Sequence, residues 1–464
     1  MPLALLALPL LLACRPAAPA ADPVVVLISW DTTRADALSC YAAELPWRPE
    51  LSGVPAPSTP VADGLAAQGV RFAWALAHAP TTLASHTSLM SGQDSHGTAV
   101  VRNGTPVPAG LPLLAERFAA AGWDTLAVVG ASTLSADMGL NRGFRIYDDA
   151  VHTVVRVRTE DDAAHVTARA LAAVDQRRPG PLFLFVHYFD PHSPWDSAPA
   201  AVQARLAPPG SPTEPTALIA EVHDGTLTTA EALTARGMYL AEVAWADDQT
   251  GVLLDGLRAR GLLDNALVAL VADHGEALDD PGLAPYGHGQ DVDLAAIHVP
   301  LLLRGTGRFA LPAGTVVDRQ VRLQDLGTTL LHAAALPGGA LGAGQDLSPL
   351  WKAAAAGKTA PAAPPSFAEA TKPERLESRT AWNNLPLSRS IAHDGLFLTL
   401  SPYRHNGATL YRLAAGQPRA TPDPAAAADL VTRLRAWDQR APPHRTVVQS
   451  EQTQEALRAL GYVE

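Results

Sequence analysis

The sequence predicts an α/β protein that folds as a three-layer sandwich, with a mainly parallel central sheet and a smaller C-terminal subdomain. Two observations predict this class. Continuous apolar runs rich in β-branched residues recur along the chain, and such runs are typical of strands covered on both faces. Helix-like stretches separate these runs, and strands that alternate with helices pair in parallel. Ligands of such folds bind at the carboxyl ends of the strands.

The predicted elements follow one another in the order that a layered α/β domain requires. Strands are expected in PVVVLISWD near the start of the body and then at 124–130, 181–188, 265–273 and 298–305. Helices are expected at 111–122, 161–176 and 228–261.

A change of composition divides the body of the chain. In KAAAAGKTAPAAPPS, residues 352–366, Ala and Pro displace the strand pattern, so we interpret this stretch as a linker. The catalytic domain is placed at 24–351 and the smaller subdomain at 367–464. That subdomain is expected to contain a strand at 395–401 and helices near 424–437 and 451–460.

The N-terminus indicates export. Residues 3–14 form a 12-residue apolar run, too short for the roughly 20 residues that span a bilayer but typical of a signal-peptide core. The Leu-Leu-Ala-Cys that ends at Cys14 resembles the lipobox of bacterial lipoproteins. We therefore expect a signal peptide at 1–13, lipidation of Cys14, a tether at 14–23, and a membrane-anchored protein of the cell envelope, facing the periplasm or the surface. An ordinary secretory signal or a buried N-terminal segment would also fit the apolar run.

Composition excludes several classes of protein. Two cysteines in 464 residues cannot form a disulfide framework or a four-cysteine zinc module. The formal net charge of −11 argues against a nucleic-acid partner, which requires a basic face.

Polar residues cluster where three predicted strands end. These residues are Asp31, His187, Asp190, His192, Asp273, His274 and, shortly afterwards, His288. Because the carboxyl ends of parallel strands share one edge of a sheet, we expect the side chains to meet there. Asp31, Asp273 and His274 offer the oxygen and nitrogen ligands of a divalent cation, which could be Ca, Mg, Mn or Zn.

A Thr/Ser-rich turn, HAPTTLASHTSLMSG at 78–92, leads into a short predicted helix. Backbone N–H groups at a helix N-terminus favour an anion. Coordination to a dication lowers the pKa of an alcohol, so Thr82 is a candidate nucleophile. The competing interpretation is that Thr81 or Thr82 only caps the helix.

Six segments occur in a recognisable order: VVLISWDTTRADALSCY, TLASHTSLMSG, HYFDPHSPW, DNALVALVADHGEAL, YGHGQDVDLAAIHVPLLLRGTG and EALRALGYVE. Together they resemble the sulfatases, a branch of the alkaline-phosphatase-like superfamily, over nearly the whole chain. The resemblance implies an alkaline-phosphatase-like sandwich and an anionic ester substrate.

The resemblance also implies a role for individual residues. Asp31, Asp273 and His274 match metal ligands, and Thr82 matches the catalytic position. His192 matches a histidine that contacts the ester or leaving group, and His288 falls near a basic residue that stabilises the transition state. Weaker matches are His86, His187 and Gln290 as substrate contacts, and Asp190 as a second metal ligand or a structural acceptor.

The sequence departs from the family pattern at the nucleophile. Formylglycine sulfatases oxidise a Cys or Ser to an aldehyde, whereas Thr82 would give a ketone. Ala84 and His86 replace the Pro and Arg of the signature, Thr32 replaces a second aspartate, and the Gly-Lys-Trp-His block is not recognisable after the strand at 124–130. Threonine does act as a metal-bound nucleophile in related lipoteichoic-acid synthases and phosphoethanolamine transferases.

The leading hypothesis is a metal-dependent hydrolase or transferase that acts on sulfuric or phosphoric esters through Thr82, without formylglycine. A second hypothesis is a catalytically degenerate surface protein that binds an anionic glycan or headgroup. A third assigns the nucleophile to Ser85. Tyr188 and Trp195 either line a substrate pocket or pack in the core.

Overall fold

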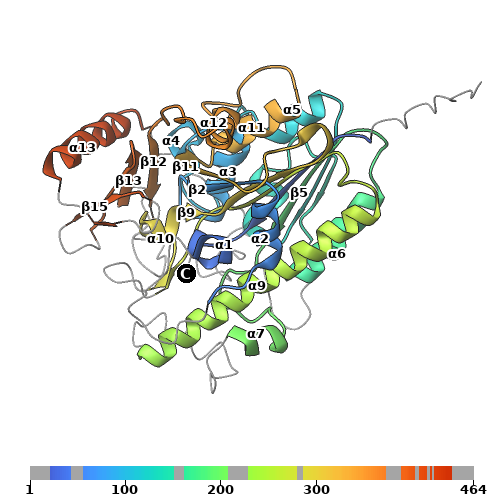
Figure 1. Cartoon of the computed structure of the whole chain (residues 1–464), viewed down its shortest axis with the longest axis horizontal. Helices are drawn as coiled ribbons and strands as arrows, with labels where there is room; N and C mark the ends of the chain where they lie inside the picture. Colours follow the sequence, from blue (N-terminus) through green and yellow to red (C-terminus); the bar gives the residue numbers. More distant parts are fainter. Residues whose placement is uncertain are drawn as a thin grey trace, which may run out of the picture.

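The computed structural model describes residues 21–42, 56–150, 161–206, 228–278, 286–371, 388–402, 407–414, 419–420 and 423–441. A nine-stranded sheet lies between two layers of helices (Figure 1), which agrees with the predicted fold class. The predicted lipidation site at Cys14 and the predicted helix near 451–460 lie outside the described residues.

The large sheet is mainly parallel. Its spatial order is β11 (Thr315–Arg322), β2 (Val70–Leu76), β10 (Leu301–Gly305), β6 (Ala266–Ala272), β1 (Val24–Trp30), β5 (Leu182–Tyr188), β3 (Asp124–Val129) and β4 (Ile146–Asp148). β10 runs antiparallel to both neighbours, and the short β9 (His298–Val299) pairs antiparallel with β2. The predicted strand at 298–305 is therefore two strands, both running against the rest.

Helices cover both faces of this sheet. Successive residues of β1 point to opposite faces, so Val25 and Leu27 join one hydrophobic core while Val26 and Ile28 join the other. The first core is covered by α3 (Thr82–Ser91), α5 (Leu114–Ala120), α11 (Asp325–Ala333) and α12 (Ser348–Ala355). The second core is covered by α1 (Ser39–Ala42), α2 (Pro60–Ala67), α6 (Ala163–Asp175), α7 (Ala200–Leu206) and α9 (Thr229–Ala259).

Local signals explain where the two longest predicted helices begin. Asp162 accepts hydrogen bonds from the N–H groups of Ala164 and His165 at the start of α6. Thr228 and Glu231 form a capping box at the start of α9. Both helices begin within two residues of the predicted positions, because the capping residues are visible in the sequence.

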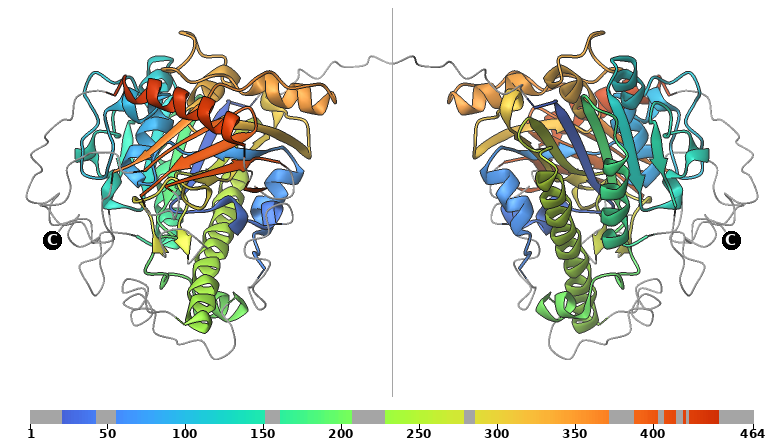
Figure 2. Two further views of the ribbon diagram at one scale, coloured as in Figure 1. Left: turned by 90° about the vertical axis from the view of Figure 1, so that its left-hand side faces the viewer. Right: turned by 90° about the vertical axis from the view of Figure 1, so that its right-hand side faces the viewer.

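The C-terminal subdomain contains a second, antiparallel sheet. Its strands are β12 (Ser366–Ala370), β13 (Ser388–His393), β14 (Leu396–Leu400), β15 (Ala408–Arg412) and β16 (Arg419–Ala420). Helix α13 (Pro424–Asp438) lies across these strands (Figure 2) and buries Leu430, Leu434 and Trp437 against Ile391 and Leu398. The sequence predicted β14 and α13 but not the other strands, which are short and contain many polar residues.

The connection between the two sheets is shorter than predicted. α12 continues to Ala355 and β12 begins at Ser366, so residues 352–355 of the predicted linker belong to a helix.

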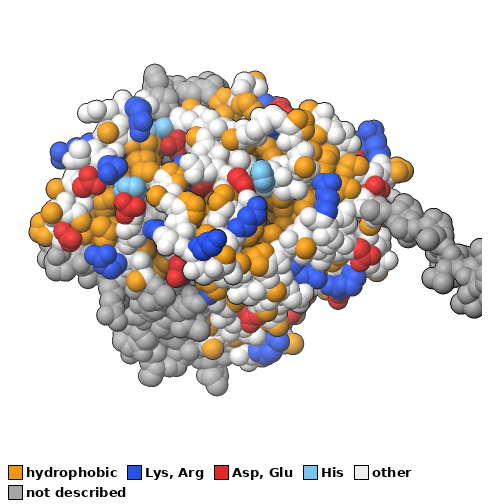
Figure 3. All heavy atoms as spheres, turned by 45° about the horizontal axis from the view of Figure 1, so that its top comes forward, with side chains coloured by type: hydrophobic (Ala, Val, Ile, Leu, Met, Phe, Trp, Pro, Cys, Tyr) orange, Lys and Arg blue, Asp and Glu red, His pale blue; other side chains and the backbone are white. Residues whose placement is uncertain are grey.

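The face in Figure 3 shows acidic and basic side chains interspersed, and they do not gather there into one basic tract. Among the described residues, no helix combines the length and the apolar composition needed to cross a membrane.

Candidate active site

The register of β1, β5 and β6 places the predicted ligands side by side at the carboxyl edge of the sheet. Trp30 at the end of β1 pairs with Tyr188 of β5 on one side and with Ala272 of β6 on the other. The residues that follow these strands therefore leave the sheet side by side, and among them are Asp31 and Asp273.

Asp31, Asp273 and His274 form a group whose ligand atoms all lie within 4.8 Å of one another. The side chains of all three are fully buried. Asp31 Oδ1, Asp273 Oδ2 and His274 Nε2 have no hydrogen-bond partner among the residues that the structure describes. Buried polar atoms without partners are costly, so this donor set fits a divalent cation.

The ionisation of the group is consistent with such an ion. Burial, reinforced by the nearby Asp31 carboxylate, raises the pKa of Asp273 well above its usual value. Burial opposes ionisation of Asp31 as well, but a hydrogen bond with His187 and attraction to His274 hold the pKa of Asp31 below its usual range. Burial lowers the pKa of His274 to about 4, so its ring is neutral near pH 7.

The turn that carries Asp31 is held by a tyrosine that the sequence did not single out. Thr32 has a φ of 48°, a left-handed conformation that is strained for a β-branched residue. The Tyr239 hydroxyl donates a hydrogen bond to Thr32 O and accepts one from Arg34 N–H, both at 3.0 Å. Thr32 N–H in turn donates to Asp273 Oδ1 at 3.3 Å, which links the two ligand segments.

Gly275 allows the His274 segment to approach a neighbouring loop. A Cβ atom at this position would lie 2.1 Å from Ala295 O, and Gly275 N–H donates to Ala296 O at 2.7 Å. Only glycine therefore fits beside this metal-ligand candidate.

Thr82 is the first residue of α3, and its hydroxyl points to the group of ligands. Thr82 Oγ1 donates to Asp31 Oδ2 at 3.3 Å. Thr81 occupies the N-cap position, but its hydroxyl makes no capping hydrogen bond. The N–H of Leu83 is instead bonded to Asn103 Oδ1 at 2.8 Å. Capping, the competing role for both threonines, is thus performed by Asn103.

His192 and His288 face each other beside this helix end. Each ring places Nδ1 near a backbone carbonyl, Ser193 O at 2.7 Å and Pro80 O at 3.0 Å, so Nδ1 carries the proton. Their Nε2 atoms are 3.1 Å apart, and the His288 ring lies 4.5 Å from that of His274. Two facing lone pairs repel, so a donor or cation from a ligand would be favoured between the two Nε2 atoms.

His86 lies against the group of ligands, with its Nδ1 3.5 Å from Asp273 Oδ2. Its side chain is fully buried, its Nε2 is 2.9 Å from Ser29 Oγ, and its Nδ1 is 2.8 Å from Thr82 O. Burial lowers the pKa of His86 to about 3. Both ring nitrogens are engaged within the protein, and the expected substrate contact of His86 stays a prediction.

His187 is also fully buried, with Nε2 3.4 Å from Asp31 Oδ2 and its ring against that of His86. It contacts a metal-ligand candidate, so the structure places it in support of Asp31. Gln290, 4% exposed, lies on the segment that carries His288.

Asp190 lies apart from the group of ligands, beside Glu242 of α9. Burial raises the pKa of Asp190 to about 7, and neither carboxylate oxygen has a hydrogen-bond partner among the described residues. Glu242 accepts hydrogen bonds from the N–H groups of Ser197 and Ala198. No donor bonds to the Asp190 carboxylate among the described residues, so both of its expected roles, second metal ligand and structural acceptor, stay predictions.

Ser85, Tyr188 and Trp195 support the fold around the site and do not face the ligands. Ser85 Oγ donates to Asp273 O at 2.6 Å, so its hydroxyl holds the backbone of a ligand segment. The Tyr188 hydroxyl lies 2.8 Å from Thr167 Oγ1 on the opposite face of the sheet, and Trp195 packs edge-on against Tyr239. Both aromatic residues are core residues.

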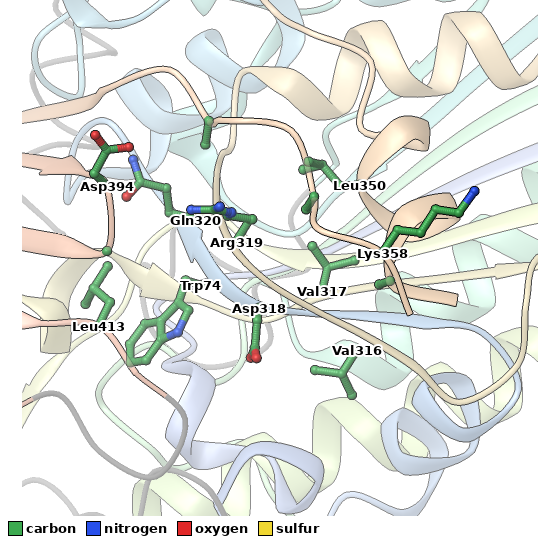
Figure 4. Close-up of a pocket in the computed structure, with 14 residues that line it drawn as sticks. Trp74, Val316, Val317, Asp318, Arg319, Gln320, Leu350, Lys358, Asp394 and Leu413 are labelled. Atoms are coloured by element: carbon green, nitrogen blue, oxygen red, sulfur yellow. The ribbon is translucent and has the colours of Figure 1, made fainter. Parts of the chain in front are cut away.

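A separate cavity of about 450 Å³ lies between β11, α12 and the turn that joins β13 to β14 (Figure 4). Its lining includes Trp74, Arg319, Lys358 and Asp394 but none of the predicted site residues. The residues at the strand ends therefore remain the candidate active site.

Comparison with known proteins identifies the family of the chain. Residues 23–336 match the sulfatase family model. Arylsulfatase K from Bos taurus and from Canis lupus familiaris are each 32% identical over 117 residues. That match covers 24% of this chain and only 20% of either relative.

Solved structures share the fold across most of the chain. The phosphonate monoester hydrolase from Silicibacter pomeroyi is 21% identical with a TM-score of 0.64, covering 91% of this chain and 96% of that one. A protein solved in complex with its substrate D-glucosamine-2-N,6-O-disulfate is 16% identical with a TM-score of 0.66, covering 90% and 98%. The alkaline-phosphatase-like fold is therefore confirmed. The family model spans more than half of the sequence, and the chain belongs to the sulfatase family.

Proposed function

We propose that this protein is a metal-dependent hydrolase of sulfate, phosphate or phosphonate esters with Thr82 as its nucleophile. The observation that carries the proposal is the Thr82 hydroxyl, which starts a helix and donates to Asp31 Oδ2 at 3.3 Å within the group of unpartnered ligand atoms. Structural neighbours include phosphonate monoester hydrolases and a protein that binds a sulfated glucosamine, and these support the ester class.

Asp31, Asp273 and His274 would hold the metal ion. When bound, a divalent cation lowers the pKa of a neighbouring hydroxyl and offsets the charge of an anionic ester. Asp31 orients Thr82 Oγ1 by accepting its hydrogen bond. The N–H groups of the first turn of α3 favour the anionic sulfur or phosphorus group.

His192 and His288 would act on the other side of the ester. Their Nε2 atoms share the space next to the helix end, and a proton held between them is available to the departing oxygen. Because both Nδ1 atoms are bonded to backbone carbonyls, the rings cannot rotate freely and keep Nε2 directed inward.

Formylglycine is not required in this scheme. The Thr82 oxygen attacks sulfur or phosphorus as the bond to the ester oxygen breaks and that oxygen takes up a proton, and water then cleaves the bond to Thr82 and restores its hydroxyl. Ser85, the other hydroxyl of the short motif, is bonded to Asp273 O. A peptide mass spectrum is expected to show unmodified threonine at position 82.

The decisive experiment compares Thr82→Ala and Thr82→Ser in metal-replete protein, with aryl sulfate, aryl phosphate, aryl phosphodiester and phosphonate monoester substrates. Thr82→Ala should lower kcat by at least about 10³-fold, as expected for loss of a nucleophile, whereas Thr82→Ser keeps a hydroxyl and should retain most turnover. Unchanged turnover in Thr82→Ala would exclude the covalent role.

The same substrate panel tests the second hypothesis. It is motivated by the loss of the Pro and Arg of the sulfatase signature at Ala84 and His86. Metal-replete wild-type protein that turned over none of the esters, yet bound a sulfated glycan, would identify an anion-binding protein instead of an enzyme.

Export and lipid anchoring through Cys14 remain part of the proposal, on the basis of the apolar run at 3–14. Expression of the full chain in a bacterium should place it in the membrane fraction, and Cys14→Ala should release it. An unchanged membrane fraction in Cys14→Ala would contradict lipidation.

A further inference from the structure

A second cavity lies where α13 of the C-terminal subdomain packs against the catalytic domain. Its volume is about 530 Å³, which is within the usual range of small-molecule sites. The candidate active site contributes no residue to its lining. One wall is formed by α13, and another by His78 in the connection between β2 and α3. A molecule bound in this cavity would therefore contact both parts of the chain.

The inner lining of the cavity contains two histidine nitrogens that have no hydrogen-bond partner among the described residues. His78 is fully buried, and its Nδ1 lies 2.7 Å from Phe367 O, so Nδ1 carries the proton and Nε2 is left as an unused acceptor. His96, in α4 (Ser95–Thr98), places Nε2 3.3 Å from Glu369 Oε2, and its Nδ1 has no partner. Buried polar atoms of this kind indicate bound water or a ligand.

A hydroxyl group of a ligand suits both nitrogens. It donates a hydrogen bond to His78 Nε2, and because a hydroxyl both donates and accepts, it fits His96 Nδ1 in either protonation state. Other parts of the lining are apolar, and they include the rings of Phe367 and Trp437, which stack with their centroids 5.0 Å apart. Apolar walls with a few convergent polar groups are typical of a small-molecule site, and a sugar combines hydroxyls with apolar C–H faces.

The mouth of the cavity is basic. Arg433 and Arg440 line it from α13 and the residues just after that helix, and both are exposed. Arg433 pairs only with the exposed Asp429, a weak type of contact, and Arg440 has no ion-pair partner among the described residues. The acidic residue of the lining, Asp94, already accepts the Trp437 Nε1–H at 2.8 Å. In a chain of net charge −11, this mouth favours an anionic group.

We infer that this cavity binds a sugar that carries a sulfate or phosphate group, at a site separate from Thr82. Hydroxyls of the sugar occupy the inner lining at His78 and His96, and the anionic group lies at the mouth between Arg433 and Arg440. The inference goes beyond the proposed function and does not depend on it, because this site requires neither a metal ion nor a nucleophile.

The test measures binding in metal-replete Thr82→Ala protein, with glucose 6-sulfate, glucose 6-phosphate, glucose and inorganic sulfate as probes. Calorimetry gives the affinity, and hydrogen exchange shows whether the charged sugar protects the amides of α13. Adding Arg433→Gln and Arg440→Gln together should weaken binding of the preferred charged sugar at least about 10-fold and abolish the protection, since hydrogen bonds to a charged group are lost. Arg435→Gln is the matched control, because Arg435 is an exposed arginine of α13 that does not line the cavity.

His78→Asn tests the inner lining. The amide keeps an N–H near the position of Nδ1 for Phe367 O but removes Nε2, so the melting temperature should stay close to that of the parent protein while affinity for both glucose and the charged sugar falls about 5-fold. Glucose and inorganic sulfate should each bind more weakly than the charged sugar. If no probe protects α13, or if affinity is equal in the parent, the double arginine variant and His78→Asn, the cavity holds only water and the inference is overturned. Because the parent lacks Thr82, this result is independent of whether Thr82 is the nucleophile.

Discussion

Buried carboxylates at the two ends of the parallel strands differ in their hydrogen-bond partners. At the amino end of β3, Asp124 is 7% exposed and is bonded to Arg145 through two contacts and to Arg178 N–H at 2.7 Å. At the carboxyl ends of β1 and β6, Asp31 and Asp273 are fully buried, and each retains an oxygen without a hydrogen-bond partner among the described residues.

This difference in partners distinguishes a carboxylate that stabilises the fold from one that is suited to bind a ligand. A buried carboxylate that is paired with a guanidinium contributes to the folded state, whereas one left unpaired costs free energy unless something binds there. The Asp124 carboxylate is therefore satisfied without a ligand. Asp31, Asp273 and His274 each keep an atom without a hydrogen-bond partner among the described residues, and a bound cation would offset that cost.

The largest expected difference in metal affinity and kcat is between Asp273→Asn, at the carboxyl end of β6, and Asp124→Asn, at the amino end of β3. Asp273→Asn should lower metal affinity and kcat by at least about 100-fold, because loss of even an outer partner of a metal ligand typically costs about 10–100-fold. Asp124→Asn should leave kcat unchanged but destabilise the protein by about 1–3 kcal/mol through loss of charged hydrogen bonds. Metal titration, kinetics and denaturant unfolding measure both, and a catalytic defect in Asp124→Asn would remove the contrast.

A divalent metal should raise the melting temperature of the protein, and this rise should depend on Asp273 but not on Asp124. At 100 times its dissociation constant, a ligand that binds only the folded state adds about 2.7 kcal/mol. Wild type and Asp124→Asn should both melt at a higher temperature with the preferred ion and return to the lower value with a chelator. Asp273→Asn should show no such shift. If Ca, Mg, Mn and Zn all leave the wild-type melting temperature unchanged, the group does not bind metal.

Two buried tyrosines of the second core, one bonded to the Asp31 turn and one not, allow a matched test of that turn. Tyr239→Phe leaves Thr32 O and Arg34 N–H without their hydroxyl partner and should weaken metal binding about 10-fold, as an outer partner does. Tyr188→Phe also removes a buried hydroxyl, but one directed to Thr167, so it should destabilise the fold without changing metal affinity. Competition with a chelating dye measures the affinity, and equal values for the two variants would show that Tyr239 has only a structural role.

The smallest expected effect is a pH dependence at the amino end. Burial opposes ionisation of Asp124, but hydrogen bonds from Arg145 and from Arg178 N–H outweigh it and hold the pKa below 3.8. A carboxyl group with a lowered pKa stabilises the protein above the unfolded pKa, and this contribution is lost as pH falls toward the folded value. The gap in melting temperature between wild type and Asp124→Asn should therefore narrow between about pH 5 and pH 3. A difference in melting temperature that stays constant over this pH range would show that the charge of Asp124 does not contribute to stability.

The candidate site could be predicted from sequence where its residues adjoin the strands. Asp31, Asp273 and His274 each follow an apolar strand directly, so strand prediction alone places them at one edge. Neither Asn103 nor Tyr239 has such a signal, because one lies in a loop and the other within the apolar face of a 31-residue helix. The dipeptide Asn-Gly at 103–104 indicates a turn but not what the amide bonds to.

Periodicity and strand-end chemistry by themselves determined the α/β class, the strand and helix order around the site and the group of metal-ligand candidates, because those features depend on residues close together in the chain. The threonine at position 82 was equally plain from sequence alone. Only the tertiary structure decided that His86 contacts Asp273, that Asn103 performs the capping expected of Thr81, and that His192 faces His288. Those relations join segments far apart in sequence, and side-chain packing, which has no local signature, sets which of their atoms are bonded and which are left for a ligand.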